Sequence, residues 1–486
     1  MKRLMRNMVF LLLFVFCVTT NALALSKLQL GCIKMMVVHN KDKKVKEAYQ
    51  LLLDKKVLME RAEQEWDLAT VYPGSSHPDI AEAISVLQEA EILEVKPINW
   101  QGTDNAIELL IDGEEIYERA VQMIERAQRT IRFNMFLWGG SVGHRVMEAM
   151  VKAQERGVSV QIITMPTSWL DRITTPLQNW AAKNSKDNHL PVYKGIKEEA
   201  KAAGLRVAEY PVGKLNKFGF SKADHNKLLS IDSTEALVGG MNFADCIAKN
   251  HDIMLWISGP AVLELEETFA DNWRFCGEKD PLAQQASPCW TDERLLSEAT
   301  KIRGRAIGRV TCTYSNAVKN ATRKLVEDAI DNAEKKIRII MFVLTDDAIV
   351  DKIIAAHERG VDVMVLVDPN CHAFGMKLPG LPNLTTVRQL KKAGITVKAY
   401  KAQDGYQCHI KAGMFDDKYT IVGSTNWTTA GFDCNAESLV GVESKDLAAD
   451  FQALFDLDWE QSYEFKSDGI GRFILSVGTE ALDFGF

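Results

Sequence analysis

The sequence predicts an α/β fold of two pseudo-symmetric lobes, each a mixed sheet flanked by helices. The chain has 486 residues, which exceeds the usual size of one domain core. Apolar runs typical of buried strands alternate with helical patterns, as they do in a layered α/β sheet. The same order of elements occurs twice, and a period of about one domain excludes a solenoid.

The first repeated elements are a helix and a buried strand. The helical patterns lie at 116–127 and 321–333, and the apolar runs that follow lie at 129–136 and 335–342. A second helix ends in both copies with the tetrapeptide Glu-Arg-Gly-Val, whose glycine fits a helix C-terminal cap. The later elements expected in each copy are strands at 159–164 and 362–367, helices ending near 203 and 393, and strands at 206–210 and 396–400.

These repeats divide the chain into domains. We expect the first lobe at 105–278 and the second at 306–462, joined by a connector at 279–305. Residues 25–104 form a largely helical N-terminal extension by pattern, and residues 463–486 form a C-terminal tail. Neither flank carries a pattern that indicates a role.

The N-terminus has the layout of a secretory signal peptide at 1–24. A positive stretch at 2–6 precedes the almost wholly apolar run Met8–Val18, and the small residues Ala22 and Ala24 follow. We therefore expect cleavage after Ala24 and export to the periplasm or the medium, with membrane association as a further possibility. The alternative is an uncleaved anchor, although the apolar run is shorter than the roughly 20 residues that span a bilayer.

Composition narrows the classes of partner and cofactor. The net charge of −7 argues against a general nucleic-acid binder, which would carry a basic field. The nine cysteines are scattered without a CxxC spacing, so a structural zinc site is not expected. The sequence predicts no metal and no cofactor.

The most informative feature is a short string that occurs twice with identical spacing. A histidine is followed by lysine after two residues, aspartate after seven, glycine after fourteen and asparagine after seventeen. Two copies in register imply a duplicated half-site, in which both halves are needed. The first copy comprises His225, Lys227, Asp232, Gly239 and Asn242, and the second comprises His409, Lys411, Asp416, Gly423 and Asn426.

Two such half-sites facing one another suit a phosphodiester. One histidine can attack phosphorus and form a phosphohistidine, while the other protonates the leaving oxygen. The lysines, Lys227 and Lys411, would hold the nonbridging oxygens as point charges, and Asn242 and Asn426 would donate hydrogen bonds to them. This chemistry requires no metal, because the lysines supply the positive charge.

The acidic residues divide into two groups. Each histidine needs an acid on its other ring nitrogen, and the candidates are Asp252 in the first half and Glu437 in the second. The motif aspartates, Asp232 and Asp416, are counted with the catalytic set. Their positions at strand ends nevertheless favour a structural role, in which they tie loop backbone together.

The paired motif resembles the signature of the phospholipase D superfamily, and the flanking stretches are similar to its bacterial cardiolipin-synthase-like branch. The resemblance covers about residues 105–462. It implies lobes packed around a pseudo-twofold axis, with His225 as nucleophile and His409 as general acid. One departure is Gly240, where the family more often has serine, as the second copy does at Ser424, which we place with the phosphate-binding residues.

The substrate is less firmly indicated. Cardiolipin synthases of this branch usually begin with two membrane spans, whereas this chain has one signal-like segment. The resemblance thus favours an exported phospholipase D that releases phosphatidic acid and a head group. A cardiolipin-synthase-like phosphatidyl transferase, a nuclease of the same superfamily and a non-catalytic binding protein are the alternatives.

The expected partner is a phospholipid membrane surface. The loop at 214–222 combines basic and aromatic residues and suits an anionic interface, although it equally suits an ordinary solvated loop. No stable nucleic-acid partner is expected. The internal duplication makes a monomer sufficient to assemble the site.

Overall fold

A computed structural model describes residues 98–166, 196–211, 223–279, 290–301, 306–315, 321–369, 382–401, 406–433 and 435–465. It also describes the two isolated positions 44 and 47. The predicted signal peptide, most of the predicted helical extension and the loop at 214–222 lie outside these residues. Most of the predicted C-terminal tail also lies outside them.

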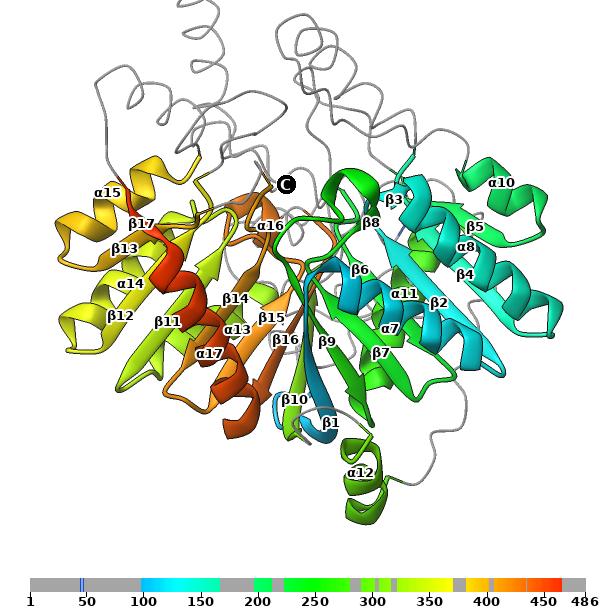
Figure 1. Ribbon diagram of the computed structural model, residues 1–486, viewed down its shortest axis with the longest axis horizontal. Coiled ribbons are helices and arrows are strands. Elements are labelled where there is room, and N and C mark those ends of the chain that lie inside the picture. Colours follow the sequence, from blue (N-terminus) through cyan, green and yellow to red (C-terminus); the bar gives the residue numbers. More distant parts are fainter. Residues whose placement is uncertain are drawn as a thin grey trace, which may run out of the picture.

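The described residues form one mixed sheet of 15 strands with a mirrored strand order. The first lobe, coloured blue to green in Figure 1, contributes the order β1-β9-β7-β6-β2-β4-β5, and the second lobe, yellow to red, repeats it as β10-β16-β15-β14-β11-β12-β13. The two series meet at the centre, where β1 (Thr103–Ile111) pairs antiparallel with β10 (Ala306–Ser315). This mirrored order confirms the predicted fold class.

The remaining strands of the first lobe are β2 (Thr130–Met135), β4 (Ser159–Thr164), β5 (Arg206–Glu209), β6 (Lys227–Ile231), β7 (Glu235–Gly239) and β9 (Ile253–Ser258). Those of the second are β11 (Lys336–Met341), β12 (Asp362–Val367), β13 (Thr396–Ala399), β14 (Lys411–Phe415), β15 (Tyr419–Gly423), β16 (Glu437–Glu443) and the edge strand β17 (Tyr463–Glu464). A separate two-stranded sheet joins β3 (Trp138–Gly139) to β8 (Phe243–Ala244).

Helices cover both faces of each half-sheet. In the first lobe these are α7 (Asp112–Arg126), α8 (Gly140–Glu155), α10 (Ile196–Ala202) and α11 (Ala261–Phe275), and a 3₁₀ turn, η1, spans Asp245–Ile247. In the second they are α13 (Thr322–Asp331), α14 (Asp347–Glu358), α15 (Leu384–Lys392), α16 (Thr429–Asp433) and α17 (Lys445–Gln461).

Alternation along the strands explains this layering. Neighbouring residues of one strand point to opposite faces, so Leu228 packs in the cluster that contains α11 and Leu229 in the cluster that contains α7 and α8. The second lobe has the same plan, with α17 on one face and α13, α14 and α15 on the other. In Figure 1 α17 crosses the front of the second half-sheet, whereas α11 lies behind the first.

The repeated elements expected from the sequence are present in both lobes. The strands β4 and β12 span 159–164 and 362–367 as predicted, and the glycines after α8 and α14 adopt positive φ angles of 93° and 95°. Among the elements that were not expected are the central strands β1 and β10, the strand β17 in the predicted tail, and α12 (Asp292–Ala299) in the predicted connector. Because one sheet runs through both halves, the lobe boundaries stay a prediction.

None of the helices among the described residues combines the length and the apolar character needed to cross a bilayer.

The motif aspartates close the hairpins β6–β7 and β14–β15. Asp232 and Asp416 have positive φ angles of 51° and 53°, a conformation that aspartate tolerates better than most residues. The carboxylate of Asp232 accepts hydrogen bonds from the backbone N–H groups of Gln128, Arg129 and Thr130 at 2.7–2.9 Å. Asp416 binds the equivalent groups of Glu334, Lys335 and Lys336 at 2.7–3.2 Å.

These contacts give both aspartates a structural role at the hairpins, which differs from their place in the predicted catalytic set. Each lies five residues beyond its lysine, and a strand advances about 3.3 Å per residue, which places it roughly 16 Å from the start of the strand. The structural role suggested by their position at strand ends is the one that the structure shows.

Replacing Asp416 by alanine should lower the free energy of unfolding by about 2 kcal/mol, because backbone donors lose a charged acceptor. Burial alone would raise the pKa of Asp416, but the backbone N–H groups of Glu334, Lys336 and Lys335 outweigh it and hold the pKa below its ordinary value of 3.8. The destabilisation should therefore be full above pH 3.8 and shrink as the pH falls through the lowered folded value.

Urea unfolding at several pH values measures this effect. Asp417→Ala is the matched control, because Asp417 has the same φ of 53° but its carboxylate is exposed and pairs, among the described residues, with the Lys336 side chain. Equal destabilisation by the two substitutions would show that backbone conformation, and not the carboxylate, carries the effect.

Candidate active site

Each motif histidine is held by a short segment of the opposite lobe. The backbone N–H of His225 donates to the carbonyl of Ala436 at 2.8 Å, and that of His409 donates to the carbonyl of His251 at 2.7 Å. These bonds belong to parallel bridges that join residue 224 to 436 and residue 251 to 408. The two halves therefore exchange segments around the site.

Each imidazole ring also binds a carboxylate of the opposite lobe. Nδ1 of His225 lies 2.9 Å from Oε1 of Glu437, and Nδ1 of His409 lies 2.7 Å from Oδ2 of Asp252. The acids predicted from the sequence are thus the acids found, but each serves the histidine of the other half. With Nδ1 bound to a carboxylate, Nε2 of each ring remains the atom available for chemistry.

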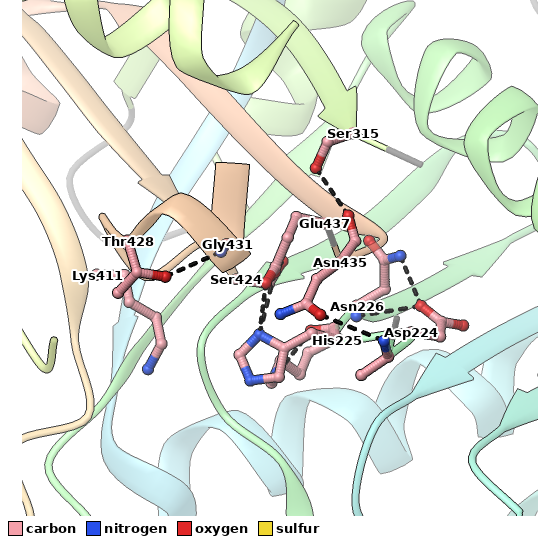
Figure 2. A network of polar contacts seen from close by, with 12 residues as sticks. Asp224, His225, Asn226, Ser315, Lys411, Ser424, Thr428, Gly431, Asn435 and Glu437 are labelled. Carbon is pink, nitrogen blue, oxygen red and sulfur yellow. Dashed lines mark hydrogen bonds and ion pairs between the residues drawn. The ribbon is translucent and has the colours of Figure 1, made fainter. Parts of the chain in front are cut away.

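Figure 2 shows the surroundings of His225, with Glu437 and Ser424 above the ring and Asp224 beside it. Ser424 donates a short hydrogen bond from its hydroxyl to Glu437, and the backbone N–H of Ser438 donates to the Ser424 oxygen at 3.0 Å. His225 and Glu437 are both almost completely buried, at 2% and 0% exposed side chain. A carboxylate in such a place needs these donors, because burial without them is costly.

The lysines lie beside the histidines and over aromatic rings. Each lysine donates from Nζ to the backbone carbonyl of the histidine two residues earlier. Lys227 lies 5.0 Å from the centre of the Phe136 ring, and Lys411 lies 4.8 Å from that of Phe342. The same rings contact the imidazoles, with centroid separations of 4.8 Å for Phe136 and His225 and 4.7 Å for Phe342 and His409.

The asparagines differ between the halves. Oδ1 of Asn242 accepts a hydrogen bond from the backbone N–H of Leu137 at 3.0 Å, which fixes the amide. The Asn426 side chain is fully buried, yet neither of its polar atoms has a hydrogen-bond partner among the described residues. An unpaired buried amide is costly, so Asn426 is suited to bind a group that enters the site.

Burial and positive charge set the protonation states. Burial, followed by the charges of Lys227 and Lys411, holds the pKa of His225 well below 6.5, so its imidazole is neutral at neutral pH. Burial and Lys411 lower the pKa of His409 to about 4, against the opposing effect of Asp252. Burial also lowers the pKa of Lys411 to about 8, although Asp252 and Glu437 oppose the shift.

The site thus gathers basic groups in a buried place, where burial and their mutual repulsion lower their pKa values. An anionic phosphodiester would relieve their mutual repulsion and favour their charged forms. Neutral His225 has a free Nε2 lone pair that can attack phosphorus, and His409 becomes a better proton donor once an anion is bound. Within the described ranges, no group of three or more His, Cys, Asp or Glu side chains is arranged to hold a metal ion.

Comparison with known proteins identifies the family. The sequence matches the profile of the family described as cardiolipin synthase, PLD-like domain, over residues 120–273 and 326–459, which is more than half of the chain. The chain belongs to this family. The two matched segments correspond to the two lobes, which agrees with the duplication.

Known relatives have low sequence identity to this chain but align with most of its length. Cardiolipin synthase A of Pseudomonas putida (strain W619) is 23% identical over 380 residues, which cover 75% of this chain and 71% of the relative. Cardiolipin synthase A of Pseudomonas aeruginosa (strain LESB58) is 24% identical over 377 residues, or 75% of this chain and 69% of the relative.

A solved structure supports the fold. The crystal structure of phosphatidylserine synthase from Haemophilus influenzae Rd KW20 aligns with a TM-score of 0.55 at 14% identity, covering 78% of this chain and 92% of that chain. This likeness shows the fold alone. The family match makes the chain an enzyme of the phospholipase D superfamily, of the phosphodiesterase or phosphatidyl transferase type.

Sequence reasoning missed several residues of the PLD-like site. The segments that exchange between the lobes share the pattern Asn-x-acid, with Asn250 and Asn435 at their starts. Each asparagine accepts a backbone hydrogen bond at 3.2 Å from the residue two positions before the opposite histidine, namely Gln407 or Ala223. The repeated pattern was visible in the sequence, but the pairing across lobes was not.

The Gly240 departure has a steric cause. A Cβ atom on Gly240 would lie 2.2 Å from Oδ1 of Asp252, which is far closer than real Cβ contacts. In the second half, Ser424 is accommodated because its acid is the longer Glu437. The small Gly240 therefore occurs with Asp252 in one half, and the larger Ser424 occurs with Glu437 in the other.

Gly240→Ser should displace Asp252 from His409 and lower phosphodiester turnover by roughly 10- to 100-fold, the usual effect of disturbing a residue that orients a catalytic ligand. The double substitution Gly240→Ser with Asp252→Glu recreates the pairing of the second half and should restore part of the loss. Steady-state turnover of the three proteins measures this. Near-normal turnover of the single variant would contradict the steric argument.

Proposed function

We propose that the enzyme is a phosphatidyl transferase of the cardiolipin synthase type, working through a phosphohistidine. The observation that carries the proposal is the exchanged pair of acid–imidazole bonds, which leaves Nε2 of each ring available for chemistry in a site where His225, Lys227 and Lys411 are buried. The family match and the cardiolipin synthase relatives favour transfer over the hydrolysis that the sequence suggested.

The first step forms the covalent intermediate. Nε2 of His225 attacks the phosphorus of a phospholipid, a P–N bond forms, and the P–O bond to the head group breaks. His409 gives the proton on its Nε2 to the leaving oxygen, so the head group departs as a neutral alcohol. Lys227 and Lys411 stabilise the negative charge on the nonbridging oxygens, and Asn426 donates a hydrogen bond to one of them.

The second step decides between transfer and hydrolysis. His409, now neutral, removes a proton from an incoming hydroxyl group whose oxygen attacks phosphorus while the P–N bond breaks. An alcohol acceptor gives a new phospholipid, and water gives phosphatidic acid. Cardiolipin carries two phosphatidyl groups on one glycerol, so its formation by transfer requires phosphatidylglycerol as the acceptor.

The proposed substrate lies in a membrane surface, and the protein acts as a monomer because one chain supplies both half-sites. We also propose that the chain is exported, on the strength of its signal-like N-terminus. N-terminal sequencing of the mature protein would test this, since export through this segment predicts a chain that begins at Leu25.

Phosphatidylglycerol vesicles test the proposed reaction. Full-length protein with chelator should convert them to cardiolipin and glycerol, whereas phosphatidic acid with glycerol would indicate hydrolysis. His225→Ala and His409→Ala should each lower product formation by at least about 10²- to 10⁴-fold, because each removes a group that acts on phosphorus or on a proton. Asp417→Ala, on an exposed turn, is the control and should be normal.

Two results would contradict the proposal. Cleavage of single-stranded DNA with no lipid product would favour a nuclease, and lack of turnover of any diester would favour a binding protein. Alkaline quenching during turnover should also trap labelled phosphorus of the phosphatidyl group on His225, because the P–N bond of phosphohistidine survives alkali but is hydrolysed in acid. Label on His409 would reverse the assignment of nucleophile and general acid.

A further inference from the structure

The two exchanged segments differ at their middle residue. The first has His251 between Asn250 and Asp252, whereas the second has Ala436 between Asn435 and Glu437. The backbone at the two positions is equivalent, because His251 and Ala436 each donate one hydrogen bond to the opposite lobe and accept one from a motif histidine. The imidazole of His251 is therefore an addition to one half that the backbone pairing does not need.

Both ring nitrogens of His251 bind carboxylates. Nδ1 lies 2.8 Å from Oδ1 of Asp112, at the start of α7, and Nε2 lies 2.9 Å from Oδ2 of Asp458, on α17 of the other lobe. The ring also stacks on Tyr400 of the second lobe, with centroids 5.2 Å apart and planes at 6°. We call His251, Asp112 and Asp458 the His251 clamp.

The clamp requires a protonated imidazole, since both nitrogens must donate to carboxylates that only accept. Burial alone would lower the pKa of His251, but the hydrogen bonds and charges of Asp112 and Asp458 outweigh it and raise the pKa to about 10. The side chain of His251 is 11% exposed and that of Asp458 7%, whereas that of Asp112 is 54% exposed. The ion pair of His251 with Asp458 is therefore the sheltered part of the clamp and holds its geometry at neutral pH.

Only one of the two pseudo-symmetric positions has the clamp, although the aromatic pair beside it is present at both. Phe455 and Trp459 of α17 stack in the same way as Phe269 and Trp273 of α11, with planes at 18° and 17°. This match places Asp458 opposite Asn272, each one residue before its tryptophan. His251 of the first lobe thus binds Asp458 of the second, whereas the equivalent positions are Ala436 of the second lobe and Asn272 of the first.

The clamp is joined directly to the acid that orients His409. The backbone N–H of Asp112 donates to the carbonyl of Asp252 at 2.9 Å, and the backbone N–H of Asp252 donates to Oδ1 of Asp112 at 3.2 Å. Asp252 in turn holds Nδ1 of His409, and the carbonyl of His251 accepts the His409 N–H. Fixing the His251 ring therefore fixes both supports of His409.

We propose that His251 is a positioning residue, which fixes His409 in place through the clamp while leaving His225 unaffected. The inference rests on the proposed function, in which His409 moves a proton in both steps. His225 is held by its covalent bond during the second step and by Glu437 with Ser424 throughout. Asp252 faces Gly240 and has no equivalent hydroxyl, so the clamp replaces the support that Ser424 gives to Glu437.

The test uses a phosphatidyl diester of p-nitrophenol, whose leaving group departs as a stable anion and needs little help from an acid. The first step then depends on His225 and the lysines, whereas the second still needs His409 as base. The variant His251→Ala with Asp458→Asn reproduces the alanine and asparagine of the other half, so it leaves no unpaired partner on α17.

We expect this double variant to keep the burst of p-nitrophenol while its steady-state rate falls roughly 10- to 100-fold, as for other residues that orient a catalytic group. Phosphohistidine should accumulate, because its breakdown has become the slow step. Should the double variant fail to fold, Asp458→Asn alone, which keeps one carboxylate on His251, must show a smaller change in the same direction.

Two results overturn the inference while the proposed function stands. A burst that falls as much as the steady-state rate would mean that the clamp supports the whole site, and an unchanged rate would mean that it does not act on His409. A wild-type protein without any burst or turnover would instead remove the proposed function, and this inference with it.

Discussion

The site depends on two hydrogen bonds that cross between the lobes, from Glu437 to His225 and from Asp252 to His409. Each lobe alone holds a histidine without its acid and an acid without its histidine. A buried carboxylate or imidazole that loses its partner is strongly destabilising, so the exchange ties assembly of the site to packing of the two halves. The continuous sheet through β1 and β10 supplies the rigid frame in which these bonds can form.

Local patterns were sufficient to predict most of the fold. Apolar runs, helical periodicity and the glycine caps placed β4, β12 and the glycines after α8 and α14 correctly, because each depends on residues close in sequence. The hairpin role of Asp232 and Asp416 was favoured from their positions at strand ends. The central pair of β1 and β10 was missed, since strand pairing between distant segments leaves no local periodic signal.

The residues of the site could be predicted from the sequence, but the hydrogen bonds between the lobes could not. The duplicated spacing predicted the histidines, lysines and asparagines, and the two orienting acids were candidates because they follow shortly after each asparagine. The exchange joins residues 212 and 157 positions apart, and nothing in a single copy of the repeat indicates which half provides the acid. The positions of Phe136 and Phe342 under the lysines likewise follow from the register of β2 with β6 and of β11 with β14.

The two halves differ where their tasks in the proposed reaction differ. The nucleophile side has a longer acid, Glu437, braced by the Ser424 hydroxyl, whereas the proton-transfer side has a shorter acid, Asp252, packed against Gly240. That side is braced instead by charge, through a protonated His251 between two carboxylates. In the proposed reaction His409 gives up and takes back a proton but never forms a covalent bond that would hold it in place. An ionic support from His251, which stays protonated near neutral pH, therefore suits its position. The difference between the halves follows from the chemistry that each performs.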